Sequence, residues 1–251
     1  MHPSDNSLQG RVALVTGAGK GIGRAIALAY ARAGAAVCCA GRTESDVVAL
    51  ADDIRATGGQ AMAAAVDVTQ ETDVDRMVAS CLEAFGRLDI VVLNAGVAAE
   101  GASVEASDAQ RWRQTLDVNL FGAYLCARAA IPGLKAAGGG KVIMIGSGLG
   151  HTGQPGISDY ACAKAGLWML TRVLAQELAP HQIDVNELIP GPVDTAMTAT
   201  AVAQSHLQAN PALQQEWLKQ PEDVVPLALF LATQPPRGPT AQSFGLGRRP
   251  I

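Results

Sequence analysis

Short runs of apolar residues alternate with longer amphipathic stretches from near the start of the chain to about residue 190. Apolar runs of about four to eight residues between turn residues are typical of buried strands, and apolar positions spaced three and four apart are typical of helices. The pattern predicts six strands, at Val12–Thr16, Ala36–Ala40, Ala61–Val66, Asp89–Leu93, Lys141–Gly146 and Ile183–Ile189.

Each predicted strand is separated from the next by a segment long enough for a helix. Such crossovers join parallel strands, are nearly always right-handed and cover both faces of the sheet. We therefore expect an α/β fold: a Rossmann-like, doubly wound parallel sheet with helices on both faces. No linker or internal repeat marks a boundary, so residues 1–251 are expected to form a single domain.

Glycines mark the expected ends of the helices, at Gly34, Gly58, Gly86 and Gly138. Pro132 lies late in the fourth helical segment, where a missing donor and a crowded ring predict a kink or an early end. The alternation fails between Pro190 and Pro221, and residues 195–220 are expected to form a mobile helical flap over the substrate.

Composition and charge limit the classes of function that the chain can have. Hydrophobic residues make up 49% of the 251 residues and charged residues 17%, so a large core is expected. The formal net charge is −4 and no basic run occurs. Nucleic-acid-binding proteins usually carry a basic patch, so a nucleic-acid partner is not expected. The partner expected instead is a small-molecule substrate.

The five cysteines show no CxxC pairing and no matching set of histidines, so neither a metal site nor a disulfide framework is expected. We interpret all five as reduced core residues. The first ten residues lack a signal-peptide pattern and no apolar run is long enough to span a membrane, so a cytoplasmic location is expected.

A glycine-rich turn follows the first predicted strand and opens the first helix. Glycines at such a corner let the backbone approach a pyrophosphate, whose charge is then stabilised at the helix N-terminus. A tight corner without a ligand is the alternative. The candidate cofactor residues of this turn are Gly17, Gly19, Lys20, Gly21, Ile22 and Gly23.

The end of the second predicted strand indicates which dinucleotide binds. NAD-binding sheets usually place an acidic residue there for the adenosine ribose, whereas this chain has Arg42. A guanidinium can form two hydrogen bonds with a 2′-phosphate, and Lys20 adds a second positive charge. NADP(H) is therefore favoured, and NAD(H) stays possible because both residues could be solvated surface charges.

Tyr160 and Lys164 stand four residues apart at the start of a predicted helix, Tyr160–Leu178, and so share one of its faces. A lysine ammonium beside a phenol is expected to lower the pKa of the tyrosine and to equip it for proton transfer. Ser147 follows a predicted strand, where its hydroxyl could bind a substrate carbonyl. Taken singly, such residues are often incidental surface neighbours or turn residues.

These features, in this order, resemble the short-chain dehydrogenase/reductase family over about residues 8–235, and the length resembles that of its single-domain branch. The matching positions are Thr16 to Gly23, Asp67-Val68, Asn94-Ala95-Gly96, Asn119, Ser147, Tyr160 with Lys164, and Pro190-Gly191.

The resemblance implies an oxidoreductase that transfers hydride between NADP(H) and a small ketone or secondary alcohol. It implies that Tyr160 is the general acid and base, that Ser147 polarises the carbonyl and that Lys164 binds the nicotinamide ribose. Asn119 would hold a water of the proton relay. Further cofactor contacts are implied at Asp67, Val68, Asn94, Ala95, Gly96, Pro190, Gly191, Val193 and Thr195.

The substrate pocket is expected between residues 148–158, the loop after Gly96 and the flap. Its candidate lining residues, besides Ser147 and Tyr160, are Val97, Leu149, His151, Gln154, Met197 and Trp217. A lone histidine such as His151 is more often a solvated loop residue.

Three departures from the family pattern stand out. Leu93 replaces a frequent asparagine, and the C-terminal segment from Thr240 onward lacks the usual glycine-rich ending. Glu187 lies inside a predicted strand, where an unpaired carboxylate is costly to bury and where the sequence names no partner. Resemblance implies a homotetramer, or a homodimer.

Two alternatives remain. A 3-oxoacyl-[acyl-carrier-protein] reductase would resemble this chain, but such enzymes carry basic residues at the mouth of the site, and Gly138 and His181 stand at the matching positions here. A catalytically silent NADP(H)-binding sensor would not need the complete set of Asn119, Ser147, Tyr160 and Lys164.

Overall fold

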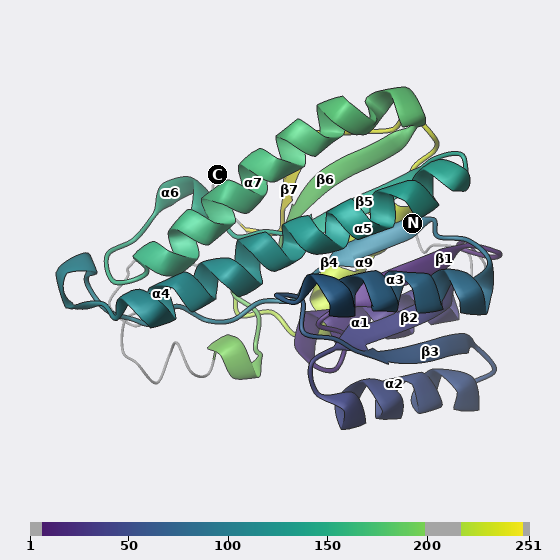
Figure 1. The fold of residues 1–251 in the computed structure, drawn as a ribbon, viewed down its shortest axis with the longest axis horizontal. Helices are drawn as coiled ribbons and strands as arrows, with labels where there is room; N and C mark the ends of the chain where they lie inside the picture. The colour runs from purple at the N-terminus through teal and green to yellow at the C-terminus, as the bar shows by residue number, and fades with distance from the viewer. Residues whose placement is uncertain (1–6, 199–216, 248–251) are drawn as a thin grey trace.

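The computed structural model describes residues 7–198 and 217–247, which form a seven-stranded, wholly parallel sheet with helices on both faces (Figure 1). The strand order is β3-β2-β1-β4-β5-β6-β7. The strands are β1 (Val12–Thr16), β2 (Ala36–Gly41), β3 (Gln60–Ala65), β4 (Ile90–Leu93), β5 (Gly140–Ile145), β6 (Ile183–Ile189) and β7 (Ser243–Gly245). The expected Rossmann-like, doubly wound fold is confirmed.

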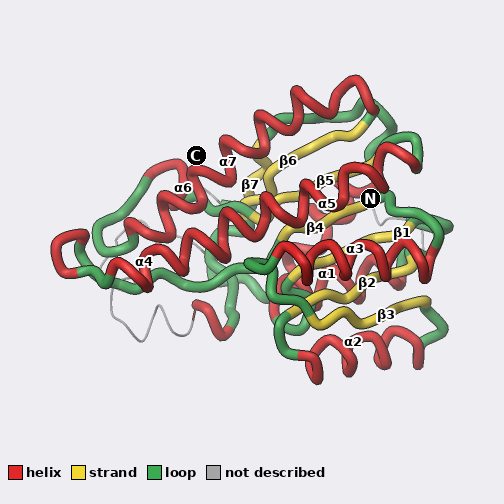
Figure 2. Tube along the Cα trace, viewed as in Figure 1, coloured by secondary structure: helices red, strands yellow, loops and turns green. Residues whose placement is uncertain are grey.

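The helices form two layers, one on each face of the sheet, as Figure 2 shows by colour. One layer contains α3 (Glu71–Phe85), α5 (Gly122–Ala136) and α7 (Ser158–Leu178), and the other contains α1 (Gly21–Arg32), α2 (Glu44–Ala56) and α9 (Val225–Thr233). Each layer buries its own apolar cluster against the sheet. The shorter helical elements are η1 (Val104–Ala106), α4 (Ala109–Leu116), η2 (Asp117–Phe121), α6 (Leu149–Thr152), η3 (Ala179–His181) and η4 (Pro221–Val224).

The strands lie where the hydrophobic pattern predicts them. The bounds of β1 and β6 agree with the prediction, and the other four differ by one residue at one or both ends. The pattern misses β7, because a three-residue strand is too short to show a period. Among the described strands, β7 pairs only with β6, with Ser243 opposite Glu187.

Of the kink or early end expected at Pro132, the early end is wrong, since α5 continues through the proline to Ala136. Burial of Ala130 and Leu134 against the apolar core stabilises the helix on both sides of the missing donor. The expectation that all cysteines are core residues is wrong for Cys162, which is exposed on α7; the other four are buried, and all five are free. Within residues 7–198 and 217–247, every helix is too short or too polar to cross a membrane.

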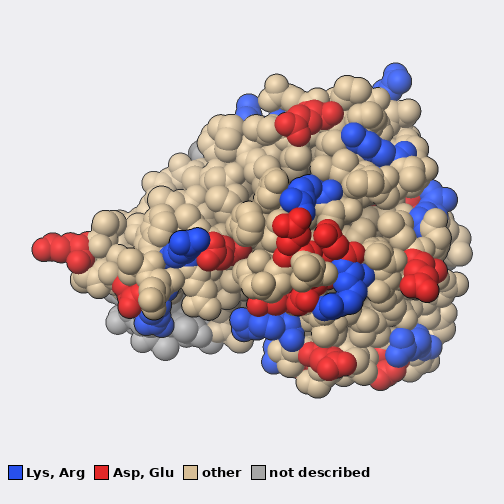
Figure 3. All heavy atoms as spheres, in the orientation of Figure 1, with Lys and Arg blue, Asp and Glu red and all other residues tan. Residues whose placement is uncertain are grey.

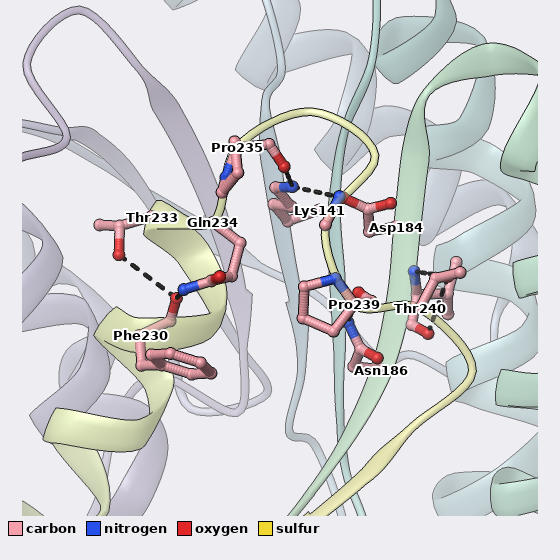
Figure 4. Close-up of polar contacts among 11 residues, drawn as sticks. Lys141, Asp184, Asn186, Phe230, Thr233, Gln234, Pro235, Pro239 and Thr240 are labelled. Carbon is pink, nitrogen blue, oxygen red and sulfur yellow. Dashed lines mark hydrogen bonds and ion pairs between the residues drawn. The ribbon is translucent and has the colours of Figure 1, made fainter.

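A loop between α9 and β7 is tied to the sheet by polar contacts with β5 and β6 (Figure 4). Lys141 forms a buried ion pair with Asp184, and its ammonium also donates to the Pro235 carbonyl at 2.8 Å. The Asn186 amide donates to the Pro239 carbonyl at 2.6 Å. These contacts position β7 beside β6 although its own apolar segment is short.

Asp89 joins the starts of β1 and β4. Its carboxylate accepts hydrogen bonds from the Val12 amide at 2.9 Å, from Arg11 at 3.1 Å and from Arg87 at 2.8 and 2.6 Å. Burial by itself raises the pKa of Asp89, but the hydrogen bonds from Arg87, Val12 and Arg11 outweigh it and hold the pKa below its ordinary value.

Asp89→Asn is expected to lower the free energy of unfolding by about 1–2 kcal/mol at neutral pH, because charged hydrogen bonds are lost. Because the pKa of Asp89 is lower in the folded than in the unfolded protein, the ionised carboxylate stabilises the fold at pH values above the unfolded-state pKa. This stabilisation is lost as the pH falls through the folded-state pKa. The difference between wild type and variant should therefore shrink below about pH 4, measured by urea unfolding. Asp52→Asn, in an exposed pair with Arg55, is the control. A difference independent of pH would contradict the ionic role of Asp89.

Candidate active site

The predicted site residues come together at the carboxyl ends of four neighbouring strands. The glycine turn follows β1, Asn94-Ala95-Gly96 follows β4, Ser147 follows β5 and Pro190-Gly191 follows β6. The chain order of the strands reverses between β1 and β4, and open α/β sheets bind ligands in the crevice that such a reversal creates. The topology therefore assembles the site from segments that lie far apart in sequence.

The glycine turn has the shape of a phosphate cradle. Gly17 and Gly21 have φ angles of 62° and 55°, a region that favours glycine. A Cβ at Gly17 or Gly23 would lie 2.8 or 2.4 Å from the Asn94 amide nitrogen, so neither position has room for a side chain. No side chain caps the N-terminus of α1, which leaves its first N–H groups directed at the turn. These residues fit a dinucleotide pyrophosphate.

Asn94 joins β1 to β4 at this edge. Its amide group donates to the Thr16 and Gly17 carbonyls at 3.0 and 3.1 Å, and its backbone N–H donates to the Thr16 hydroxyl at 3.0 Å. Leu93, which replaces the frequent second asparagine, is buried in the core. Asn94 therefore braces the junction of β1 and β4 and holds the glycine turn in place.

The two basic residues near the turn differ in their surroundings. Arg42 is exposed directly after β2. Lys20 forms an ion pair with Asp46 at 3.0 Å, and a Cβ at Gly19 would lie 2.8 Å from that of Asp46. Sequence reasoning missed Asp46, although its place in the first turn of α2, beside the strand end, was available as a signal.

The remaining cofactor candidates lie around the same crevice. Asp67 accepts hydrogen bonds from the backbone N–H and hydroxyl of Thr69 at 3.0 and 2.8 Å. A Cβ at Gly21 would lie 3.1 Å from the Thr195 methyl group, which brings the segment after β6 against the glycine turn. Val68, Pro190 and Val193 are buried; Ile22, Ala95, Gly96 and Gly191 are partly buried.

Tyr160 and Lys164 project from the first turns of α7 toward the end of β5. The Lys164 ammonium donates to the Ile145 carbonyl at 2.8 Å and lies 5.6 Å from the centre of the Tyr160 ring. Ser147, two residues beyond Ile145, forms a hydrogen bond with Tyr160. The structure therefore brings the three predicted catalytic residues together.

Burial shapes the titration of this pair. It lowers the pKa of Lys164 to about 8, although the charge of Glu187 acts to raise it. It raises the pKa of Tyr160 above the ordinary value, and the hydrogen bond from Ser147 offsets only part of this increase. The expected lowering of the tyrosine pKa is therefore wrong for this structure, because desolvation of the phenolate dominates.

Asn119 lies in η2, a short π-helical segment between α4 and α5. Its side chain forms two hydrogen bonds with the backbone of Val97: it accepts from the N–H at 2.9 Å and donates to the carbonyl at 3.0 Å. A Cβ at Gly96 would lie 2.5 Å from the Asn119 oxygen. Asn119 is thus buried against the loop after β4, beside the predicted site.

The candidate substrate residues occupy different positions around the opening of the predicted substrate pocket. The Leu149 N–H donates to the Ser147 hydroxyl at 3.3 Å. Val97 and Gln154 are partly buried, and Met197 and Trp217 are exposed.

Most of the expected flap, residues 199–216, lies outside the described residues. His151 is not a solvated loop residue, because its ring packs against Trp168 and binds Glu187.

Glu187 has partners that the sequence alone does not reveal. The His151 Nε2 atom lies 2.9 Å from its Oε2 atom, and the Ser243 hydroxyl donates to the same oxygen at 2.5 Å. His151 and Ser243 are 36 and 56 residues away along the chain. Only the packing of α6 and β7 against β6 brings them together, so no local pattern could have shown this cluster.

Asp159 is a second residue that the sequence analysis missed. It is buried beside Tyr160 at the start of α7, where it accepts hydrogen bonds from the Thr115 hydroxyl at 2.9 Å and the Glu100 N–H at 3.0 Å. It ties the loop after β4 and helix α4 to α7, which carries Tyr160 and Lys164. An acidic residue at the start of a helix was the signal available in the sequence, but the sequence does not reveal the partners of Asp159.

Gly138 and His181 lie at the amino ends of β5 and β6, opposite the edge that carries Ser147. Within one chain they do not border the site. In the part of the chain that the structure describes, no group of three or more His, Cys, Asp or Glu side chains could hold a metal ion.

Comparisons with known proteins agree with this geometry. The family model for short chain dehydrogenases matches residues 11–206. The chain is 36% identical to a 3-oxoacyl-[acyl-carrier-protein] reductase of Synechocystis, with 91% of this chain and 92% of that protein covered. It is 38% identical to a cis-4-hydroxycyclohexanecarboxylate dehydrogenase of Sinomonas cyclohexanicum, with 94% and 92% covered.

A solved structure of a short-chain type dehydrogenase/reductase from Mycobacterium marinum superimposes with a TM-score of 0.87 at 34% identity, over 96% of both chains. The family model covers well over half of the chain, and the relatives match it nearly end to end. The chain therefore belongs to the short-chain dehydrogenase/reductase family, oxidoreductases that interconvert CH–OH and C=O groups with a nicotinamide cofactor.

Proposed function

We propose that this protein transfers hydride between NADP(H) and a small ketone or secondary alcohol, with Tyr160 as the general acid and base. The observation that carries the proposal is the convergence of Ser147, Tyr160 and Lys164 at the carboxyl ends of the sheet, next to a glycine turn shaped for a pyrophosphate. The bound cofactor would supply or accept the hydride.

In this mechanism Tyr160 gives its proton to the substrate oxygen during reduction and takes it back during alcohol oxidation. Ser147 donates a hydrogen bond to the same oxygen, where negative charge develops. Lys164 holds a positive charge beside the phenol and binds the nicotinamide ribose, and Asn119 holds a water of the proton relay. A tyrosine with a raised pKa keeps its proton at neutral pH, and the reductive direction needs this protonated form.

The cofactor would lie along the crevice from the glycine turn to the strand end of β6. The turn and the N-terminus of α1 would hold the pyrophosphate, Asp67 and Val68 the adenine, and Asn94, Ala95 and Gly96 the ribose side. The residues proposed for the nicotinamide carboxamide are Pro190, Gly191, Val193 and Thr195. The proximity of Thr195 to Gly21 supports a single continuous site.

For the substrate we propose a small, uncharged carbonyl compound or alcohol in contact with Ser147, Leu149, Gln154, Tyr160, Met197 and Trp217. Acidic and basic side chains are interspersed at the end of the molecule formed by η1 and α4 (Figure 3). Glu100, Glu105 and Asp108 lie there, before and at the start of α4. Arg111 and Arg113 of α4 share this end, so it does not form the uniformly basic surface that an acidic carrier protein would need.

Tyr160→Phe is expected to lower kcat by about 10²- to 10⁴-fold, because the general acid is lost. Binding of NADPH, followed by fluorescence, should change less than about threefold, since the phenol oxygen contributes little to holding the cofactor. Oxidation of NADPH against a panel of ketones, aldehydes and acyl thioesters measures the first effect and reports the substrate class.

Tyr124→Phe, at an exposed tyrosine on α5, is the matched control and should retain full activity. Retained activity in Tyr160→Phe would contradict the mechanism. Preference for acyl thioesters carried on a protein would favour the carrier-protein reductase, and inactivity of the wild type across the panel with tight NADPH binding would favour a sensor.

Arg42→Ala tests the cofactor preference. Because Asp46 already neutralises Lys20, most of the favourable charge for a 2′-phosphate would come from Arg42. The Kd for NADPH should rise about tenfold on loss of one charged hydrogen-bonding group, with that for NADH nearly unchanged. Arg32→Ala, at the exposed end of α1, is the control. Equal effects on both nucleotides, or a wild-type preference for NADH, would contradict this assignment.

We also propose that the protein assembles as a homotetramer or homodimer. Large apolar side chains are exposed on the outer sides of η2, α5, α7 and α9, namely Phe121, Tyr124, Met169, Val173 and Phe230. Burying them between copies would remove apolar surface from water. Light scattering coupled to size-exclusion chromatography should give two or four times the chain mass of 25.8 kDa, and a monomer at micromolar concentration would contradict the proposal.

A further inference from the structure

Glu187 is a fully buried carboxylate in the third-to-last position of β6. Its Oε2 atom is bound by His151 and Ser243, whereas its Oε1 atom has no hydrogen-bond partner among the described residues. A buried carboxylate with one oxygen unsatisfied is costly, and such groups are retained mainly where they serve a purpose besides packing.

The unsatisfied oxygen lies against the backbone of the catalytic strand end. A Cβ at Gly146 would lie 1.9 Å from Oε1, so only glycine leaves room for the carboxylate at this position. Gly146 stands between Ile145, whose carbonyl accepts a hydrogen bond from Lys164, and Ser147, which binds Tyr160. The Glu187 carboxylate therefore contacts the segment that holds two of the catalytic side chains.

His151 extends this contact to the catalytic helix. It lies in α6, its ring packs against Trp168 of α7 with centres 4.8 Å apart and planes tilted by 50°, and its Nε2 atom binds Glu187. The neighbouring Gly150 is packed so closely on α7 that a Cβ there would lie 2.8 Å from the Cβ of Lys164. The cluster thus connects β6 and β7 to α6 and α7 directly behind the site.

We propose that Glu187, together with His151, is a positioning residue of the active site: its carboxylate keeps Lys164 cationic and fixes the segment that carries Ser147. This inference rests on the proposed role of Tyr160 and Lys164. Neither Glu187 nor His151 takes part in proton transfer to the substrate; they act through Lys164 and the backbone at Gly146.

The sign of the electrostatic effect follows from the groups that face Glu187. These are His151 from α6, Lys164 from α7 and the neutral Ser243 from β7; the other acidic residue of β6, Asp184, is paired with Lys141. The negative charge of Glu187 raises the pKa of Lys164 against the effect of burial. A cationic Lys164 in turn favours the Tyr160 phenolate that alcohol oxidation needs.

Glu187→Gln removes this charge while keeping the size of the side chain. Lys164 then loses its proton at lower pH, and Tyr160 keeps its proton to higher pH. The acidic limb of the kcat profile for alcohol oxidation should move upward by about one pH unit, as expected for the loss of a nearby charge in a desolvated site. The substrate for this assay is the best alcohol found with the panel.

Asp184→Asn is the matched control, because it removes another buried carboxylate from the same strand (Figure 4). It should lower the melting temperature and leave the acidic limb in place. An unmoved limb in Glu187→Gln overturns the proposal, and so does an equal movement in Asp184→Asn, since the effect would then be a general one of destabilisation.

The contact with Gly146 is tested separately. Gly146→Ala should displace the carboxylate and lower the melting temperature and kcat, whereas the same substitution in a Glu187→Ala background should lower the melting temperature much less. Additive effects of the two substitutions would show that Glu187 does not lie against Gly146, and would overturn the proposal.

The role of His151 is tested by a pair of variants, which also decide the question should Glu187→Gln fail to fold. His151→Phe keeps a ring in contact with Trp168 but loses the bond to Glu187, and should lower kcat about tenfold with the KM for the cofactor within twofold. His151→Gln retains a donor and should recover most of the loss. Identical kinetics in the wild type and His151→Phe, or no recovery in His151→Gln, would overturn the proposal.

Failure of this inference is distinguishable from failure of the proposed function. If Tyr160→Phe is inactive but the limb of Glu187→Gln does not move, the mechanism stands and the positioning role falls. If Tyr160→Phe retains activity, the mechanism itself falls.

Discussion

Hydrogen bonds between Thr16 and Asn94 join the carboxyl ends of β1 and β4, and the rest of the site depends on this junction. The two strands are neighbours in the sheet, but the order of the strands along the chain reverses between them. The segments that follow them therefore run in different directions, and no short connection holds the two strand ends together. The same asparagine amide occupies the space where side chains at positions 17 and 23 would be. Glycine in the turn is therefore required by the junction as well as by any ligand.

Burial is the second constraint, because it acts on every charged group behind the site. Desolvation raises the pKa of Tyr160 and lowers that of Lys164, so each group is driven toward its neutral form. Both effects oppose the pair of phenolate and ammonium that alcohol oxidation would use. Ser147 and Glu187 act in the other direction, one on the tyrosine and one on the lysine. The balance depends on contacts made by residues outside the short motif Tyr160-x-x-x-Lys164.

The sequence was sufficient for the architecture and for the residues that motifs carry. Six strands follow from apolar runs, because five of them are almost wholly buried and the edge strand β3 is partly buried. Ser147 and Tyr160 are found from their places after a strand and at the start of a helix. The sequence was insufficient for β7, a three-residue strand that packs only Phe244 against the core and whose place beside β6 also depends on the contacts of Lys141 and Asn186 with the preceding loop. Contacts of this kind depend on packing between distant segments, which leaves no periodic trace along the chain.

The same reason explains why the partners of Glu187 could not be named in advance. Strand β6 contains two buried carboxylates, and their surroundings differ in a way that the strand itself does not reveal. Asp184, near its start, has a lysine and a backbone N–H as partners, as expected for a charge that stabilises the fold. Glu187, near its end, keeps one oxygen unsatisfied against Gly146. A carboxylate that served only stability would be better replaced by an apolar side chain of similar size. Its position beside the strand end that binds Lys164 gives the charge an effect that no apolar residue could have.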